Sequence, residues 1–318
     1  AIEVRIKGAS VEVICNDSSI NPTEVFHAIE NQTIPDCSTH TQSITIQARI
    51  DKSQYLHKVE RIKDHIHRGD IYELNLCQEF YAEDCEIDPV QIWKKLNNVS
   101  PTPFASFFRN NNRYILCASP ERYLRKLGTR IISQPIKGTI KRSSDPAEDA
   151  KLKEQLYNDP KERSENVMIV DLVRNDLTRC ASPGTVKVDE LFGVYSFKQV
   201  HQLISTVSAA LNPKFSYLEA IKDTFPMGSM TGAPKIKAMQ LIERYEESMR
   251  GVYSGCIGYI TANDNFDFNV VIRSIVYNAT EHYLSFQVGG AITSNSVAEK
   301  EYEECLLKAQ AIKQVLLN

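Results

Sequence analysis

The order of strand-like and helix-like segments constrains the fold of this 318-residue chain more than any other feature. Strand patterns come in runs that a few helices interrupt, and they do not alternate regularly with helices. The strand patterns fall at 71–81, 114–118, 121–127, 130–136, 256–261, 266–277 and 283–288. The helix patterns fall near 88–98, 146–158, 160–176 and 234–248. This order predicts an α+β fold and argues against a doubly wound parallel sheet.

The N-terminal part carries further patterns of the same kind. Apolar and polar residues alternate at 2–6 and again at 11–13, which predicts a hairpin around Gly8. Residues 43–50 have the pattern of another strand. A helix is predicted at 52–68, because its apolar side chains fall on one face and a glycine follows it.

No internal repeat and no low-complexity linker divides the chain. The sequence therefore predicts one domain over residues 1–318. Within it, residues 1–50 are expected to form a short β-rich N-terminal portion, and residues 53–318 to form the core that carries the motifs described below.

The composition is typical of a soluble globular protein, with 42% hydrophobic and 24% charged residues. A net charge of −3 gives no long-range attraction for nucleic acid or an anionic membrane, so neither is expected as a partner. No stretch approaches the ~20 apolar residues that cross a bilayer, and the first residues do not resemble a signal peptide, which predicts a cytoplasmic protein. The eight cysteines lack zinc-binding spacing and are expected to be reduced.

Several short motifs follow one another along the chain. They are Gln-Pro-Ile-Lys-Gly-Thr at 134–139, Lys-Glu-Arg-Ser-Glu at 161–165, Met-Thr-Gly-Ala-Pro-Lys at 230–235, Arg-Gly-Val-Tyr-Ser-Gly at 250–255, Ile-Arg-Ser at 272–274, Gly-Gly-Ala at 289–291 and Glu-Tyr-Glu-Glu at 301–304. Each string alone would recur by chance, but the ordered set resembles the chorismate-utilising enzymes. The resemblance covers roughly residues 53 to 318.

This resemblance implies two layered antiparallel β-sheets with helices on their outer faces, and an active site between the sheets. The implied substrate, chorismate, carries two carboxylates, an enolpyruvyl ether and an allylic hydroxyl group. Such a site must bind the anions and expel the hydroxyl group.

The resemblance also implies a Mg²⁺ ion held by carboxylates from two separate helices, here Glu165 and Glu304. Mg²⁺ favours a few carboxylates together with waters and a substrate oxygen. Taken alone, Glu165 would be an exposed acidic residue in the first turns of a helix that begins after Pro160. Glu304 alone would form an exposed pair with Lys308, four residues later. The resemblance instead assigns Lys308 to a substrate carboxylate.

Arg273 is implied to bind the enolpyruvyl carboxylate, since its planar guanidinium can bind a carboxylate with two hydrogen bonds. Its apolar neighbours predict a strand, and a strand-edge arginine that faces solvent is the alternative. Tyr253 is implied to face the substrate, while Gly289 and Gly290 would offer backbone N–H donors. The family usually has glycine at the position of Ala291, which would be strained here if a positive φ is needed.

The segment ahead of Pro234 is a second candidate anion site. Gly232 lies just before a predicted helix start, where unpaired N–H groups could hold a ring carboxylate. The string is not a Walker A loop, because its glycines are too close together and no glycine precedes Lys235. Nucleotide binding is therefore not expected.

Two further residues match the family's acid and histidine positions. Glu121 matches the general acid, which must be protonated and therefore needs a buried setting that raises its pKa. The alternative for Glu121 is an ion pair with Arg122 or Arg125. His201 matches a histidine that contacts the substrate near the leaving group, and the alternative is a core histidine with satisfied hydrogen bonds.

Lys137, beside the Gly138–Thr139 turn, distinguishes the members of the family. The lysine form is similar to the aminodeoxychorismate synthases, component I, which make 4-amino-4-deoxychorismate for 4-aminobenzoate and folate synthesis. Their lysine is thought to add to ring carbon 2 as the hydroxyl group leaves carbon 4, after which ammonia enters at carbon 4. This role implies a neutral amine, and hence a lowered pKa of Lys137.

Two rival functions stay open. Anthranilate synthase large subunits usually have alanine at the position of Lys137, and the signature of their tryptophan site has no counterpart here. A non-catalytic chorismate-binding paralogue would need neither a nucleophile nor an acid. Isochorismate and salicylate synthases use a lysine to activate water where this chain has Glu73, so attack by water is disfavoured.

The source of ammonia is expected to lie outside this chain. Glutaminases carry their nucleophile in Gly-x-Cys-x-Gly, and the nearest string, residues 254–258, begins with serine. This string is better explained as a turn that enters a strand. A separate glutaminase subunit, component II, is therefore the expected partner.

Overall fold

The computed structural model of the chain describes residues 2–33 and 44–317, which fall into two compact units, Ala1–Thr41 and Gln42–Asn318. In the smaller unit, β1 (Ile2–Lys7) and β2 (Ser10–Cys15) form the predicted hairpin. A helix that was not predicted follows, α1 (Pro22–Glu30), with Asn21 as its N-cap. None of the described residues of this unit is buried. The single domain predicted for residues 1–318 stays a prediction.

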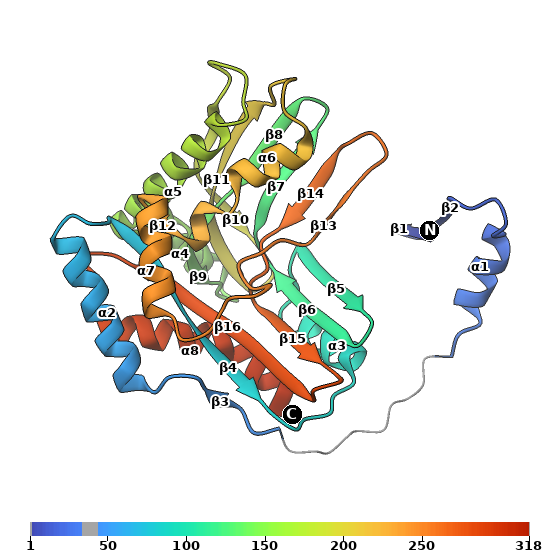
Figure 1. Cartoon of the computed structure of the whole chain (residues 1–318), viewed down its shortest axis with the longest axis horizontal. Helices are drawn as coiled ribbons and strands as arrows, with labels where there is room; N and C mark the ends of the chain where they lie inside the picture. Colours follow the sequence, from blue (N-terminus) through green and yellow to red (C-terminus); the bar gives the residue numbers. More distant parts are fainter. Residues whose placement is uncertain (1, 34–43, 318) are drawn as a thin grey trace. The chain divides into compact units, whose positions relative to one another are not determined.

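The larger unit contains two seven-stranded sheets whose strand pairings are all antiparallel in the described chain (Figure 1). The first sheet has the order β12-β4-β16-β15-β6-β5, with β3 beside β4. Its strands are β3 (Gln47–Ala48), β4 (Glu73–Ala82), β5 (Phe104–Asn110), β6 (Arg113–Ser119), β12 (Gly232–Ala233), β15 (Ser274–Asn278) and β16 (Tyr283–Ile292).

The second sheet has the order β10-β11-β8-β7-β14-β13, with β9 beside β11. Its strands are β7 (Arg122–Leu127), β8 (Arg130–Gln134), β9 (Ile136–Lys141), β10 (Lys187–Ser196), β11 (Val200–Ala210), β13 (Gly258–Ile260) and β14 (Phe266–Asn269). The predicted α+β fold with two antiparallel sheets is therefore confirmed.

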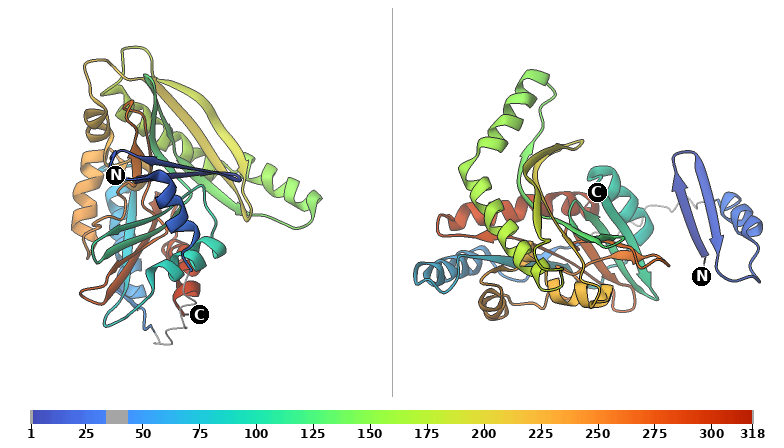
Figure 2. Two further views of the ribbon diagram at one scale, coloured as in Figure 1. Left: turned by 90° about the vertical axis from the view of Figure 1, so that its right-hand side faces the viewer. Right: turned by 90° about the horizontal axis from the view of Figure 1, so that it is seen from above.

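Helices cover a face of each sheet. They are α2 (Lys52–His67), α3 (Pro89–Val99), α4 (Pro146–Asn158), α5 (Pro160–Thr178), α6 (Tyr217–Thr224), α7 (Lys235–Tyr245) and α8 (Ala298–Leu317). Apolar side chains of α2, α7 and α8 pack on β4 and β16 to form the core of the first sheet. Figure 2 shows α4 and α5, in green, beside the yellow strands β10 and β11 of the second sheet. No helix within residues 2–33 and 44–317 is long and apolar enough to span a bilayer.

Two of the passages of the chain between the sheets are short crossovers that lie next to each other. The first crossover lies between β6 and β7, at residues 120 and 121, and the second lies between β14 and β15, at residues 270–273. A backbone hydrogen bond from Val270 N to Glu121 O (3.1 Å) joins the two crossovers, and one from Ala118 N at the end of β6 to Arg273 O (3.2 Å) holds the second crossover beside the first. The prediction of one strand over 266–277 was therefore wrong, because the apolar pattern continues through a segment that leaves one sheet and enters the other.

Several predicted boundaries also differ. The strand predicted at 43–50 is reduced to Gln47–Ala48, and residue 43 lies outside the described residues. The strand predicted at 130–136 ends at Gln134, and a new strand begins at Ile136. Pro135 explains this break, since proline cannot donate a ladder hydrogen bond. The break turns the chain so that the next strand, β9, carries Lys137.

Candidate active site

Lys137 lies where β9, β4 and α5 meet. Its Nζ donates to Glu73 Oε1 of β4 at 2.9 Å and lies 3.9 Å from Glu165 Oε2 of α5. The three side chains are close to fully buried, with exposed fractions of 12% for Lys137, 3% for Glu73 and 11% for Glu165. An amine and two carboxylates from three elements thus share one enclosed space.

Two glycines, Gly138 and Gly232, allow the elements around Lys137 to pack closely together. Gly138 has φ +89°, and a Cβ there would lie 3.2 Å from Glu162 Oε2 and from Leu156 Cδ1, so β9 packs tightly on α4 and α5. A Cβ at Gly232 would collide with the backbone oxygen of Glu73. Gly232 pairs with Leu74 across β12 and β4, so its direct role is to let β12 pack against the strand that carries Glu73.

The protonation of Lys137 differs from the expectation. Burial alone would lower its pKa, but the carboxylates of Glu73 and Glu165 outweigh burial, and the pKa of Lys137 is raised above its ordinary value. Burial therefore does not suffice to lower the pKa of Lys137 as expected, and the expected effect of a nearby Mg²⁺ stays a prediction. The physical reason is Glu73, which supplies a buried negative charge in direct contact with the amine.

Glu121 lies on the first crossover between the sheets and is buried, with an exposed fraction of 6%. Burial raises the pKa of Glu121 to about 7, and the charges of Lys137 and Arg273 oppose this rise. The alternative of an ion pair with Arg122 or Arg125 is excluded, because both arginines pair with Asp267, at 2.8 Å and 3.9 Å. Glu121 is thus a carboxyl group that can hold a proton near neutral pH.

Arg273 lies on the second crossover and does not belong to a strand, so the strand predicted for it was wrong. Its φ of +51° turns the chain between the sheets. In the described part of the chain its guanidinium makes neither a hydrogen bond nor an ion pair. Burial lowers the pKa of Arg273, while the charge of Glu121 raises it. A partly buried guanidinium that has no such partner is suited to bind an anion.

The C-terminal helix α8 brings a second group of charges to β16. Lys308 Nζ donates to Glu304 Oε1 at 2.7 Å and to Gly289 O at 2.8 Å. Burial works against the charged form of Glu304, but Lys308 and Lys161 keep its pKa below the ordinary value. Gly290 lies beside this group, because a Cβ there would be 3.6 Å from Glu304 Oε1.

Gly289 and Gly290 are part of β16, where they pair with Cys77 and Leu76 of β4. Their predicted role as backbone N–H donors to the substrate stays a prediction. Ala291 pairs with Asn75 and is absent from the positive-φ residues of the described chain, so it carries no such strain.

Two further carboxylates near this site, Glu162 and Glu301, were not predicted from the sequence. Glu162 precedes Glu165 by three residues, and Glu301 precedes Glu304 by three, so each pair shares a helical face. All four raise the pKa of Lys161, whose Nζ lies 3.8 Å from Glu165 Oε1. This spacing of three residues occurs in both motifs, at 161–165 and at 301–304, and could have indicated the additional carboxylates.

The carboxylate oxygens of Glu165 and Glu304 are of the kind that Mg²⁺ prefers as ligands. Among residues 2–33 and 44–317, no group of three or more acidic, histidine or cysteine side chains forms a preformed metal cage. Mg²⁺ is usually held by one or two carboxylates, with waters and substrate oxygens completing its shell. Burial raises the pKa of Glu165 to about 7, although the charges of Lys137 and Lys161 oppose the rise.

His201 is not brought to Lys137. Its Nδ1 lies 2.8 Å from Ser196 Oγ and its Nε2 lies 3.1 Å from Asp149 Oδ1, so both ring nitrogens have partners on the helix-covered face of β11. The next residue, Gln202, has an exposed fraction of 2% and points the opposite way, with Nε2 3.5 Å from Thr139 Oγ1. Successive side chains of a strand point to opposite faces, so Gln202, and not His201, lies on the face of β11 that meets Thr139 of β9, two residues after Lys137.

Tyr253 is also enclosed. Its hydroxyl oxygen accepts from Cys77 Sγ at 3.5 Å, within the apolar core of the second sheet. Burial raises the pKa of Tyr253 well above its ordinary value. In this arrangement Tyr253 lies beside the strand pair β4–β16, and its contact is with Cys77 rather than with Lys137.

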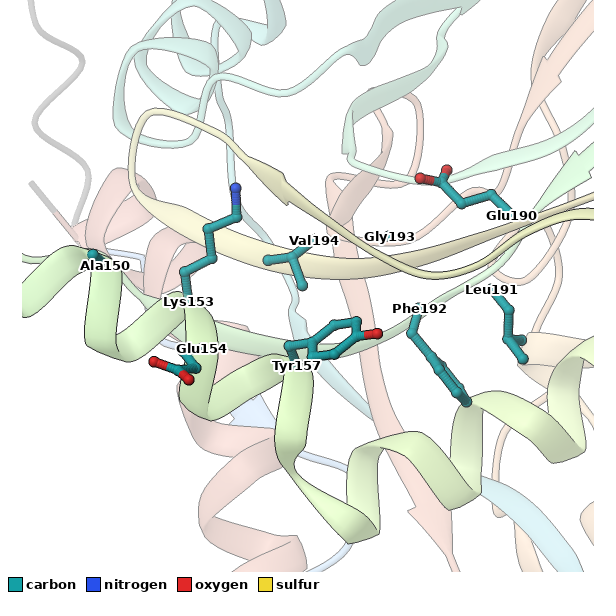
Figure 3. A pocket seen from close by; sticks show the side chains of 9 residues that line it. All are labelled: Ala150, Lys153, Glu154, Tyr157, Glu190, Leu191, Phe192, Gly193 and Val194. Carbon is teal, nitrogen blue, oxygen red and sulfur yellow. The ribbon is translucent and has the colours of Figure 1, made fainter.

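A surface groove lies apart from these residues. It is formed by α4 and β10, as Figure 3 shows, and its cavity volume is about 540 Å³. None of its lining residues belongs to the predicted site. They are Ala150, Lys153, Glu154, Tyr157, Glu190, Leu191, Phe192, Gly193 and Val194.

Comparisons with known proteins agree with this geometry. The chain is 39% identical over 284 residues to aminodeoxychorismate synthase component 1 of Klebsiella aerogenes, which covers 89% of this chain and 62% of the relative. It is 38% identical to anthranilate synthase component 1 of Bacillus subtilis, over 86% of this chain and 52% of the relative. The chain thus spans about half to three fifths of the length of these relatives.

A solved structure is similar over most of the chain. Anthranilate synthase component I from Streptococcus pneumoniae superimposes with a TM-score of 0.84 and 29% identity, over 95% of this chain and 69% of that one. The sequence pattern of chorismate binding enzymes matches residues 2–314. The chain therefore belongs to the chorismate binding enzyme family.

Proposed function

We propose that this chain is the chorismate-aminating component of an aminodeoxychorismate synthase, which converts chorismate and ammonia to 4-amino-4-deoxychorismate. The single observation that carries this proposal is the amine of Lys137, enclosed with Glu73 and Glu165 at 2.9 and 3.9 Å. The name of the Klebsiella aerogenes relative supports it. The product would serve 4-aminobenzoate and folate synthesis.

The anionic substrate would be held by the cationic groups of the site. Arg273 has a partly buried guanidinium that pairs with no described residue, which suits the enolpyruvyl carboxylate. Lys308 would contact a carboxylate from the side of β16, where Gly290 lies beside its amine. Glu165 and Glu304 would hold Mg²⁺, which when bound supplies positive charge to a substrate carboxylate. Gln202 and Thr139 would line the same space.

The reaction would proceed in two balanced halves. In the first, neutral Lys137 Nζ forms a bond to carbon 2, the ring double bonds shift, and the carbon 4–oxygen bond breaks. Glu121 donates its proton, so the hydroxyl group leaves as water. In the second, ammonia forms a bond to carbon 4 and Lys137 leaves carbon 2 with its electron pair. The new ammonium group then returns one proton to Glu121, so the sum is chorismate plus ammonia giving aminodeoxychorismate plus water.

Lys137 must be neutral at the first step, although Glu73 and Glu165 favour its ammonium form. Its proton would therefore pass to a neighbouring carboxylate as the substrate binds. Ammonia would come from a glutaminase partner, component II. The "component 1" in the names of the relatives supports a two-component enzyme.

The test is to incubate the purified chain with chorismate, Mg²⁺ and ammonium, and to identify the product by chromatography with mass detection. Aminodeoxychorismate, which an added lyase converts to 4-aminobenzoate, is the expected product. Anthranilate would instead favour the function named for the Bacillus subtilis relative. Chorismate binding without turnover would favour a non-catalytic paralogue. Use of glutamine by the chain alone would contradict the separate glutaminase.

A further inference from the structure

Lys137 lies between two carboxylates at unequal distances. Its Nζ makes a hydrogen bond of 2.9 Å to Glu73, whereas 3.9 Å to Glu165 is too long for one. The second lysine near Glu165 is Lys161, at 3.8 Å, which is also too long. In the described part of the chain, no hydrogen bond therefore reaches the carboxylate of Glu165. A nearly buried carboxylate without hydrogen bonds has unused affinity for a cation.

The position of Glu73 is fixed by its backbone. Tyr72 N donates to Ala233 O and Asn75 N donates to Thr231 O, both at 2.7 Å, on either side of Glu73. Gly232 packs directly on the Glu73 carbonyl from the facing strand. The Glu73 side chain has an exposed fraction of only 3%, so it has little space to move. Glu73 is thus a rigid acceptor for a flexible lysine.

We propose that Glu73 is a positioning residue that holds the Lys137 amine away from Glu165, and so keeps the Glu165 carboxylate free to bind a divalent cation. This inference rests on the part of the proposed function that makes Glu165 a Mg²⁺ ligand. Without Glu73, Glu165 is the one remaining carboxylate within 4.0 Å of Lys137 Nζ among the described residues. A rotation of the lysine side chain would then form an ion pair that competes with the cation.

The test is Mn²⁺ binding by the purified full-length chain, followed by the electron paramagnetic resonance signal of free Mn²⁺, without substrate or turnover. Glu73→Gln removes the charge and keeps the shape. We expect it to weaken Mn²⁺ binding about tenfold, the equivalent of ~1.4 kcal/mol. The matched control is Glu79→Gln, which changes another buried glutamate of β4 that pairs with Arg49. The control should bind Mn²⁺ as the wild type does.

A second pair of variants separates positioning from a simple loss of negative charge. In a Lys137→Met background the competing amine of residue 137 is gone while Lys161 is unchanged, so adding Glu73→Gln should change Mn²⁺ affinity less than about twofold, or ~0.4 kcal/mol. If Glu73→Gln weakens Mn²⁺ binding equally in both backgrounds, only its charge matters and the proposal is wrong. Unchanged affinity in the single variant, or no Mn²⁺ binding by any form, would also overturn it.

The proposed function is tested by a different measurement from the one that tests the role of Glu73. The product formed by the wild type from chorismate and ammonium decides that function and does not enter the Mn²⁺ measurement. Kinetics of Glu73→Gln add a further check on positioning, because the Mg²⁺ concentration for half-maximal rate should rise about tenfold while the KM for chorismate changes little. A variant with a lower melting temperature but unchanged Mg²⁺ dependence would point to a structural role only, against the proposal.

Discussion

Replacing Glu121 with glutamine is expected to change how the stability of the protein depends on pH. Burial raises the pKa of Glu121 from its ordinary value of 4.5 to about 7. The folded protein therefore binds this proton more tightly than the unfolded chain. The resulting stabilisation is fully present below the unfolded pKa of 4.5 and is lost as the pH rises through about 7. Glutamine has a similar shape and does not titrate, so the variant avoids this loss.

The magnitude follows from the two pKa values. Integrating the proton linkage between about pH 5 and about pH 8 gives a loss of about 2.5 kcal/mol for the wild type. The free energy of unfolding of Glu121→Gln, relative to wild type at the same pH, should therefore rise by about 2.5 kcal/mol between these two pH values. Groups that titrate in both proteins cancel in this difference.

Urea unfolding at both pH values provides the assay, with the fluorescence of the single tryptophan, Trp93, as the signal. Glu83→Gln is the control, because Glu83 is exposed and its replacement should leave the difference near zero. A relative stability of Glu121→Gln that is the same at both pH values would refute the reasoning. Glu121 would then be ionised in the folded protein and could not be the general acid.

Three further results are expected. Lys137→Ala should lose amination at carbon 4 or redirect it towards anthranilate, and an unchanged product by mass detection would contradict the covalent role. Glu304→Gln should lose Mg²⁺-dependent activity, which a Mg²⁺ titration of the rate would reveal; unchanged metal dependence would remove Glu304 from the ligands. Gly232→Ala should lower the free energy of unfolding by about 2 kcal/mol or more, since its Cβ would collide with the Glu73 carbonyl, and thermal unfolding would test this.

Much of the fold could be predicted from local patterns. The helices predicted at 52–68, 146–158 and 160–176 are α2, α4 and α5. Each begins after an Asp N-cap, and α4 and α5 also have proline at the first helical position, so local sequence signals were enough to predict them. The two-sheet arrangement was predicted from the family resemblance that the motifs carry. The crossover at 270–273 could not be predicted, because Val270 and Val271 are as apolar and buried as strand residues.

The parts of the site that escaped prediction depend on contacts between distant segments. The raised pKa of Lys137 is set by Glu73, which is far away in sequence and belongs to the other sheet. The choice between His201 and Gln202 depends on which face of β11 the helices cover, and the motif alone does not reveal this. Only the assembled sheets fix both properties.

The crossovers explain why the acid and the anion-binding candidate lie together between two sheets. A strand residue turns its side chain to one face of its own sheet, and its backbone groups are used in the ladder. Glu121 and Arg273 lie between the ladders, where Glu121 O accepts from Val270 N of the other crossover at 3.1 Å and Arg273 O accepts from Ala118 N at the end of β6 at 3.2 Å. This pairing places a carboxyl that retains its proton next to a guanidinium without a partner. Fixing both groups before substrate arrives lowers the cost of reorganising charge as the hydroxyl group leaves.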